Sequence, residues 1–112
     1  MTFDLEERTV TFGKRIVNLC RNVKATRLSE PMTIQLLRSA TSVGANYFEA
    51  NGASSKKDFK NKIHICKKEI KETTYWLQVL DDFCETKNEL AELQQEAHEL
   101  LLIFSKIAAS SK

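Results

Sequence analysis

The chain has 112 residues, of which 42% are hydrophobic and 29% are charged, and its formal net charge is +2 at neutral pH. This length suits one domain, in which about two-thirds of the unfolded surface becomes buried. Because only 3 residues are Gly and 1 is Pro, turn formers are too few for an all-β fold. The composition therefore predicts one all-α domain over residues 1–112.

The first ten residues, MTFDLEERTV, contain three acids and no apolar run, unlike a secretory or transit peptide. No stretch of the sequence approaches the roughly 20 apolar residues of a membrane span. We therefore expect a soluble cytoplasmic protein with no membrane partner. In a reducing compartment, the widely spaced Cys20, Cys66 and Cys84 are expected to be small core hydrophobes rather than zinc ligands or redox centres.

The first two predicted helices have apolar residues at mixed spacings of three and four, typical of a helix with one side in a core. They run from about Asp4 to Val23 and from about Glu30 to Ala50. Between them, Ser29 is predicted to be an N-cap. Small residues around Gly44 in the second helix predict close packing against a neighbouring helix.

The third and fourth predicted helices follow in the same way, from about Lys56 to Cys84 and from about Lys87 to Ala109. A left-handed C-cap is predicted at Asn51 and Gly52, and Ser55 with Asp58 resembles a capping box. Short connections make neighbouring helices antiparallel, so we expect an up-down-up-down four-helix bundle.

The third helix is sharply two-sided. Lysines occupy seven of its first sixteen positions, and at 100° per residue six of them share an arc of about 120° opposite the apolar stripe. We call these six the lysine face, and they are the predicted nucleic-acid-binding residues: Lys56, Lys57, Lys60, Lys67, Lys68 and Lys71.

Charge is also divided along the chain. Residues 8–71 hold 14 Lys or Arg against 4 acids, whereas residues 72–112 hold 3 against 8. Two interpretations remain open. The lysines either solvate a helix or pair with the acidic fourth helix, within the bundle or between subunits, or they form a phosphate-binding surface. No helix-turn-helix or RNA-recognition motif accompanies them, so contacts to RNA or DNA would fall mainly on backbone phosphates.

Catalytic and metal chemistry find no support in the sequence. A di-iron bundle needs Glu-x-x-His pairs, but neither His64 nor His98 follows a Glu by three positions. No phosphate-binding Gly-rich loop or nucleophile elbow is present. We therefore expect a protein that is not an enzyme and that has no cofactor.

A second group of residues lies near the apolar stripes of the second and third helices. Its carboxylates need partners, for which Arg38 and Lys62 are candidates. The group is predicted to form a structural network or a subunit contact, and comprises Asn46, Tyr47, Phe48, Glu49, Glu69, Glu72, Tyr75 and Trp76.

The stretch from residue 42 to residue 80 resembles the four-helix bundle family of proteins encoded in intervening sequences of bacterial 23S rRNA genes, also labelled S23. The matching patterns are S-x-G-A-N-Y-x-E-A from Ser42, S-K-K-D-F from Ser55, and K-E-x-x-E-T-x-Y-W-L from Lys68. The resemblance implies an antiparallel four-helix bundle assembled into a homopentamer, with a general biochemical role that is not established.

A similar fold occurs in the accessory protein of diversity-generating retroelements, a basic pentamer that binds a reverse transcriptase and nucleic acid. The resemblance therefore suggests RNA, DNA or a nucleic-acid-processing protein as partner, and a scaffold without a nucleic-acid ligand is the alternative. Phe48 departs from the pattern, because a basic or polar residue, usually Arg, is expected there. This departure indicates an apolar subunit contact at Phe48 rather than a phosphate contact.

Overall fold

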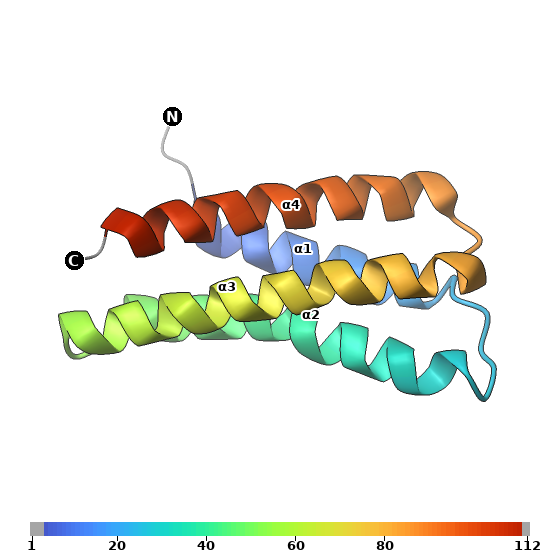
Figure 1. Cartoon of the computed structure of the whole chain (residues 1–112), viewed down its shortest axis with the longest axis horizontal. Coiled ribbons are helices and arrows are strands. Elements are labelled where there is room, and N and C mark those ends of the chain that lie inside the picture. Colours follow the sequence, from blue (N-terminus) through green and yellow to red (C-terminus); the bar gives the residue numbers. More distant parts are fainter. Residues whose placement is uncertain (1–3, 111–112) are drawn as a thin grey trace.

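The computed structural model describes residues 4–110, which form four antiparallel helices (Figure 1). The helices are α1 (Leu5–Cys20), α2 (Ser29–Asn51), α3 (Lys56–Val79) and α4 (Lys87–Ser110), and a short 3-10 helix, η1 (Leu80–Phe83), follows α3. The links from α1 to α2 and from α3 to α4 lie at one end of the bundle, and the α2–α3 turn lies at the other. The all-α, up-down-up-down prediction is confirmed.

The core consists of apolar residues contributed by all four helices at the predicted spacings. Its largest fully buried side chains include Phe12, Ile16, Leu36, Ile63, Ile70, Leu93, Leu100 and Phe104. Cys66 and Cys84 are buried with them and Cys20 packs against them. Burial raises the pKa of the Cys20 thiol to about 11 and that of Cys66 to about 12, so both stay protonated at neutral pH. The cysteines are core hydrophobes, as predicted.

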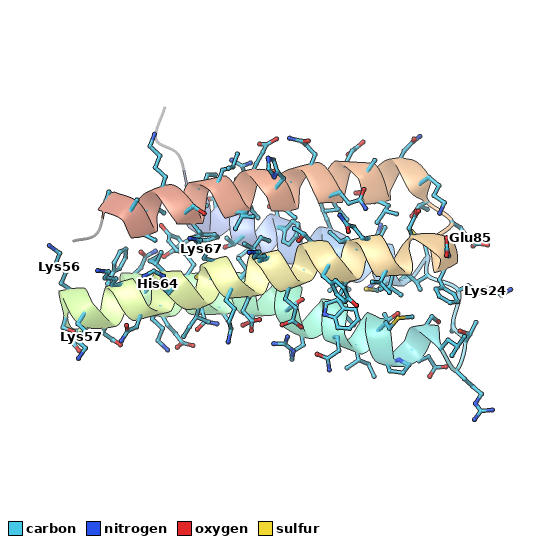
Figure 2. All side chains as sticks on the ribbon, viewed as in Figure 1. Lys24, Lys56, Lys57, His64, Lys67 and Glu85 are labelled. Carbon is cyan, nitrogen blue, oxygen red and sulfur yellow. The ribbon has the colours of Figure 1, made fainter. Side chains whose placement is uncertain are left out.

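The predicted third helix was too long, because α3 ends at Val79 and the chain tightens into η1. The cause is a contact with the link that follows α1. The N–H of Lys24 donates to the carbonyl of Phe83 at 2.7 Å, and the N–H of Glu85 donates to that of Asn22 at 3.3 Å. Figure 2 shows Lys24 and Glu85 at this end of the bundle. The first helix likewise stops at Cys20 rather than Val23.

Two of the predicted caps were wrong. Ser29 is buried as the first residue of α2, and the N-cap position is Leu28, which makes no side-chain capping hydrogen bond. The N–H of Ser29 donates to the Thr26 hydroxyl at 3.0 Å instead. Gly52 has φ −101°, outside the left-handed region, because its N–H continues a right-handed turn by donating to the carbonyl of Glu49. The Ser55 cap is confirmed, since its hydroxyl accepts the N–H of Asp58 at 3.0 Å.

Gly44 lies where α2 crosses α1. A Cβ atom at this position would lie 3.3 Å from the Thr9 hydroxyl oxygen and 3.4 Å from the Thr9 Cβ. The predicted close packing is therefore confirmed. We expect Gly44→Leu to lower the free energy of unfolding by about 1 to 3 kcal/mol, because the added side chain must push α1 away from α2. Urea denaturation measures this loss.

The matched control for Gly44→Leu is Ala91→Leu, which adds a larger side chain at an exposed position of α4. Its effect should stay within about 0.5 kcal/mol of wild type. Equal stability of the two variants would contradict a tight α1–α2 crossing.

Candidate nucleic-acid interface

The lysine face lies on the outer side of α3. Lys56, Lys57, Lys68 and Lys71 are exposed, and Lys60 and Lys67 are half-buried. In Figure 2, Lys56 and Lys57 mark the end of α3 next to the α2–α3 turn, and His64 and Lys67 follow along the helix. The fully buried Ile63, Ile70 and Leu77 form a separate stripe along α3, as the sequence predicts, and the half-buried Lys60 and Lys67 lie at the edge of the lysine face next to it.

None of the six lysines forms an ion pair or a side-chain hydrogen bond within residues 4–110. Other lysines do so: Lys62 binds the carboxylate of Glu49 at 2.7 Å, and Lys87 binds that of Asp81 at 2.9 Å. The lysine face is therefore a row of ammonium groups without ion-pair partners among the described residues. Such a row attracts polyanions.

The acids of α4 are turned toward α1 and away from the lysine face. Arginines of α1 bridge pairs of these acids at N–O distances between 2.6 and 2.8 Å, and the pairs are Arg8 with Glu96 and Glu99, and Arg15 with Glu89 and Glu92. The guanidinium of Arg8 contacts both oxygens of Glu96, the bidentate geometry that makes such pairs strong. Pairing of the lysine face with α4 inside the bundle, one part of the first sequence interpretation, is therefore wrong, while solvated lysines and pairing between subunits stay predictions.

The seam between α2 and α3 carries a polar network around Arg38. Its guanidinium donates to the Glu69 carboxylate at 2.9 Å and also to Glu72, whose carboxylate accepts the indole N–H of Trp76 at 2.9 Å. Glu69 is only 7% exposed, and its Oε1 has no hydrogen-bond partner within residues 4–110. The predicted partners are confirmed, since Arg38 forms ion pairs with Glu69 and Glu72, and Lys62 forms one with Glu49.

The other residues predicted for a network or subunit contact divide into inward and outward groups. Asn46 donates to the carbonyl and hydroxyl of Ser42 one turn earlier, both at 2.9 Å. The ring of Tyr47 turns inward and meets Phe104 edge to face, with 5.8 Å between centroids. Phe48 and Tyr75 point outward and are 50% and 57% exposed. These two side chains remain available for contacts with other molecules.

The charge of the Glu72 carboxylate makes the contribution of this network to folding stability depend on pH. Its pKa lies below the ordinary value of 4.5, first because Arg38 donates a hydrogen bond to it and then because Trp76 does. A lowered native pKa stabilises the fold above about pH 4.5, and this contribution is lost as pH falls through the native pKa. We expect Glu72→Gln to cost about 1 kcal/mol at pH 7.

That cost should shrink as the pH falls through the lowered native pKa of Glu72, because the wild-type carboxylate then becomes protonated as well. Denaturation curves of both proteins between pH 3 and pH 7 measure the difference. A difference that stays constant over this range would mean that the Glu72 carboxylate contributes nothing through its charge.

A groove of about 420 Å³ between α1 and α2 was missed by sequence reasoning. Its walls include Val10, Gly13 and Val17 from α1, and Ala45 and Phe48 from α2. Val10 and Val17 lie seven residues apart, off the core stripe of α1, and both are exposed. This seven-residue spacing could have predicted an apolar strip on the outer side of α1.

Two kinds of site are absent from residues 4–110. No three His, Cys, Asp or Glu side chains gather there in a way that could hold a metal ion. None of the helices in this part of the chain is both long enough and apolar enough to cross a membrane. The charged and apolar surfaces described above are therefore the candidate sites.

The fold and these surfaces define an all-α four-helix bundle with an unpaired basic face on one helix and an apolar groove between two others. The chain belongs to the family of 23S rRNA-intervening sequence proteins, whose family model matches residues 2–106. No curated protein matches the sequence.

A solved structure supports this assignment. It is the crystal structure of a protein of unknown function from the S23 ribosomal protein family of Bacteroides thetaiotaomicron VPI-5482, with 34% sequence identity and a TM-score of 0.79. The match covers 94% of this chain and 98% of that chain. The resemblance of residues 42–80 to this family is thereby confirmed.

Proposed function

We propose that the protein is a non-enzymatic, oligomeric cytoplasmic bundle that binds RNA or DNA through the lysine face. The observation that carries the proposal is that six lysines share one side of α3 while the acids of α4 are engaged by α1. The ammonium groups bind phosphates without first breaking an internal ion pair. A nucleic-acid-processing protein would meet the same nucleic acid and is the protein partner that fits this role.

Salt dependence tests this proposal. Binding of wild-type protein to a labelled mixed-sequence duplex, followed by fluorescence anisotropy, should weaken linearly on logarithmic axes as salt rises. The slope should be about −0.9 for each phosphate contact on duplex DNA. Binding should differ little between sequences, because phosphate contacts carry no base information. Absence of binding at low salt would leave the scaffold alternative as the function.

Assembly of several copies is the second part of the proposal. The resemblance to the family implies a homopentamer, and the apolar groove between α1 and α2 offers a surface for a second copy of this chain. Phe48 lines that groove and is half-exposed, which agrees with the subunit contact expected where the family pattern has a basic or polar residue. Large exposed apolar side chains around a groove are typical of such contacts.

Light scattering at micromolar concentration should give several times the 12.8 kDa mass of one chain, five times for a pentamer. Phe48→Glu should lower that mass, because it places a charge in an apolar contact. The matched control, Leu102→Glu, changes a similarly exposed apolar residue of α4 outside the groove and should keep the wild-type mass. A monomeric wild-type protein would contradict assembly. An unaltered mass of Phe48→Glu would contradict a subunit contact at the groove between α1 and α2.

A further inference from the structure

We propose that the lysine face binds single-stranded nucleic acid in preference to duplex, with one base stacked on the ring of Tyr75. The inference rests on the proposed function and names its substrate class. It also gives Tyr75, predicted as a subunit contact, a different role.

Tyr75 lies in line with the lysine face. Lys71 and Lys68 precede it by four and seven residues, so all three lie on one side of α3, and Lys71 is one helical turn away, about 6 Å along the axis. The Tyr75 side chain is 57% exposed. The row of cations on α3 therefore ends at an aromatic ring that is open to solvent.

The ring of Tyr75 is held in place from its protein side. It meets the Trp76 ring edge to face, with centroids 4.9 Å apart and planes at 75°. Trp76 is fixed in turn by its hydrogen bond to Glu72, which Arg38 holds from α2. An anchored ring loses little conformational freedom when a planar ligand stacks on it, so the polar network of α2 and α3 serves to position a stacking surface.

A second ring belongs to the same row. His64 is exposed and lies four residues before Lys68 and seven before Lys71, on the same side of α3. Figure 2 shows it beside Lys67 on α3. Its distance from Tyr75 is eleven residues, about 16 Å along the helix. Lysines therefore lie between two rings along the row. Single strands are bound by such combinations, in which cations contact the phosphates and rings stack on the base faces.

Duplexes and single strands present different groups to such a row. In a duplex the base faces are already stacked on their neighbours, and only phosphates and base edges remain accessible. The lysines therefore attract both forms, but Tyr75 adds affinity for unpaired bases alone. Because every base has a stacking face, the preference extends to RNA and DNA single strands of any sequence.

The test compares wild type, Tyr75→Leu and Tyr75→Phe on labelled single strands and on duplexes of equal length at one salt concentration. Tyr75→Leu should weaken single-strand binding by roughly 5- to 150-fold, which corresponds to one base–aromatic stack. Duplex affinity should stay within about twofold, since phosphate contacts are unchanged. Tyr75→Phe should bind single strands about as tightly as wild type, because it keeps the aromatic ring.

A second measurement uses the fluorescence of Trp76, which is the one tryptophan of the chain. Its emission should be quenched when wild type binds a single strand but not when it binds a duplex, because only an unpaired base reaches the Tyr75 ring beside it. Thermal melts should show that both variants are folded, as expected for an exposed position.

Three results would overturn the inference. They are equal losses on single strands and duplexes, an unchanged single-strand affinity of Tyr75→Leu, and a fall in the oligomer mass of Tyr75→Leu, which would mark Tyr75 as a subunit contact. Duplex binding by wild type would in each case leave the proposed function standing. If wild type binds neither form at low salt, the proposed function fails and this inference fails with it.

Discussion

The variant carrying Lys60→Glu, Lys67→Glu and Lys71→Glu is expected to bind mixed-sequence RNA or DNA at least roughly 100-fold more weakly than wild type at low salt. Three phosphate contacts are lost and three repulsions replace them. The slope of affinity against salt should become shallower by about 2 to 3 on logarithmic axes for duplex DNA. Stability should be maintained, because none of the three lysines belongs to the buried core and none forms an ion pair within residues 4–110. Anisotropy titrations and thermal melts check both statements.

The matched control reverses three cations elsewhere, at Lys24, Arg27 and Lys106, all of which are exposed. The change in net charge is identical, but no cation of the lysine face is touched. This control should therefore keep most of the affinity of wild type. Equal losses in the two triple variants would show that net charge alone drives binding and that α3 presents no particular surface.

Arg38→Met is expected to have the largest effect on stability among the polar residues, with a loss of about 2 to 3 kcal/mol. It leaves the buried carboxylate of Glu69 without a partner, since Arg38 is the donor to its Oε2 and its Oε1 has none within residues 4–110. Removing one member of a fully buried pair costs about 3 to 5 kcal/mol, and the loss here is smaller because the Arg38 side chain is itself 45% exposed.

The double variant Arg38→Met with Glu69→Gln should recover much of that stability, because an uncharged amide replaces the stranded carboxylate. Arg21→Met, at an exposed arginine just after α1, is the control and should stay within about 0.5 kcal/mol of wild type. Urea denaturation provides all three values. If Arg38→Met matched the control, Glu69 would have to be stabilised in another way.

The helices and the core were predictable because their signal is local. The spacing of Ile63, Ile70 and Leu77 places them on one side of α3 whatever lies around it, and the lysine face then falls outside this buried stripe. The partners of Glu69 and Glu72 were predictable for a related reason. A carboxylate near a core stripe needs a cation, and Arg38 lies in the helix that packs against α3.

The end of α3 and the cap of α2 were not predictable from local sequence, because both depend on contacts between distant segments. The turn from Asn22 to Lys24 pairs with the chain after α3, and this pairing ends the helix before Cys84. In the α1–α2 link, Thr26 and Ser29 both offer a hydroxyl, and only the path of the link decides that the Thr26 hydroxyl accepts the N–H of Ser29.

The direction of the acidic side of α4 could have been predicted but was not. Arg8 and Arg15 are seven residues apart on α1, and Glu89 and Glu96 are seven apart on α4, which is the repeat of two helices that face each other. Total charge by segment hides this match, because a sum over residues 72–112 carries no direction. The facing repeats, in contrast, leave the lysine face without an internal partner.

Lysine footprinting shows directly whether nucleic acid binds at the lysine face. Wild-type protein, free and saturated with a single-stranded oligonucleotide at low salt, is treated with an acetylating reagent, and each lysine is quantified by mass spectrometry. The six residues of the lysine face are expected to become protected in the complex, while Lys24, Lys87 and Lys106 react as in the free protein. Uniform protection of all lysines, or the absence of a complex at low salt, would contradict this expectation.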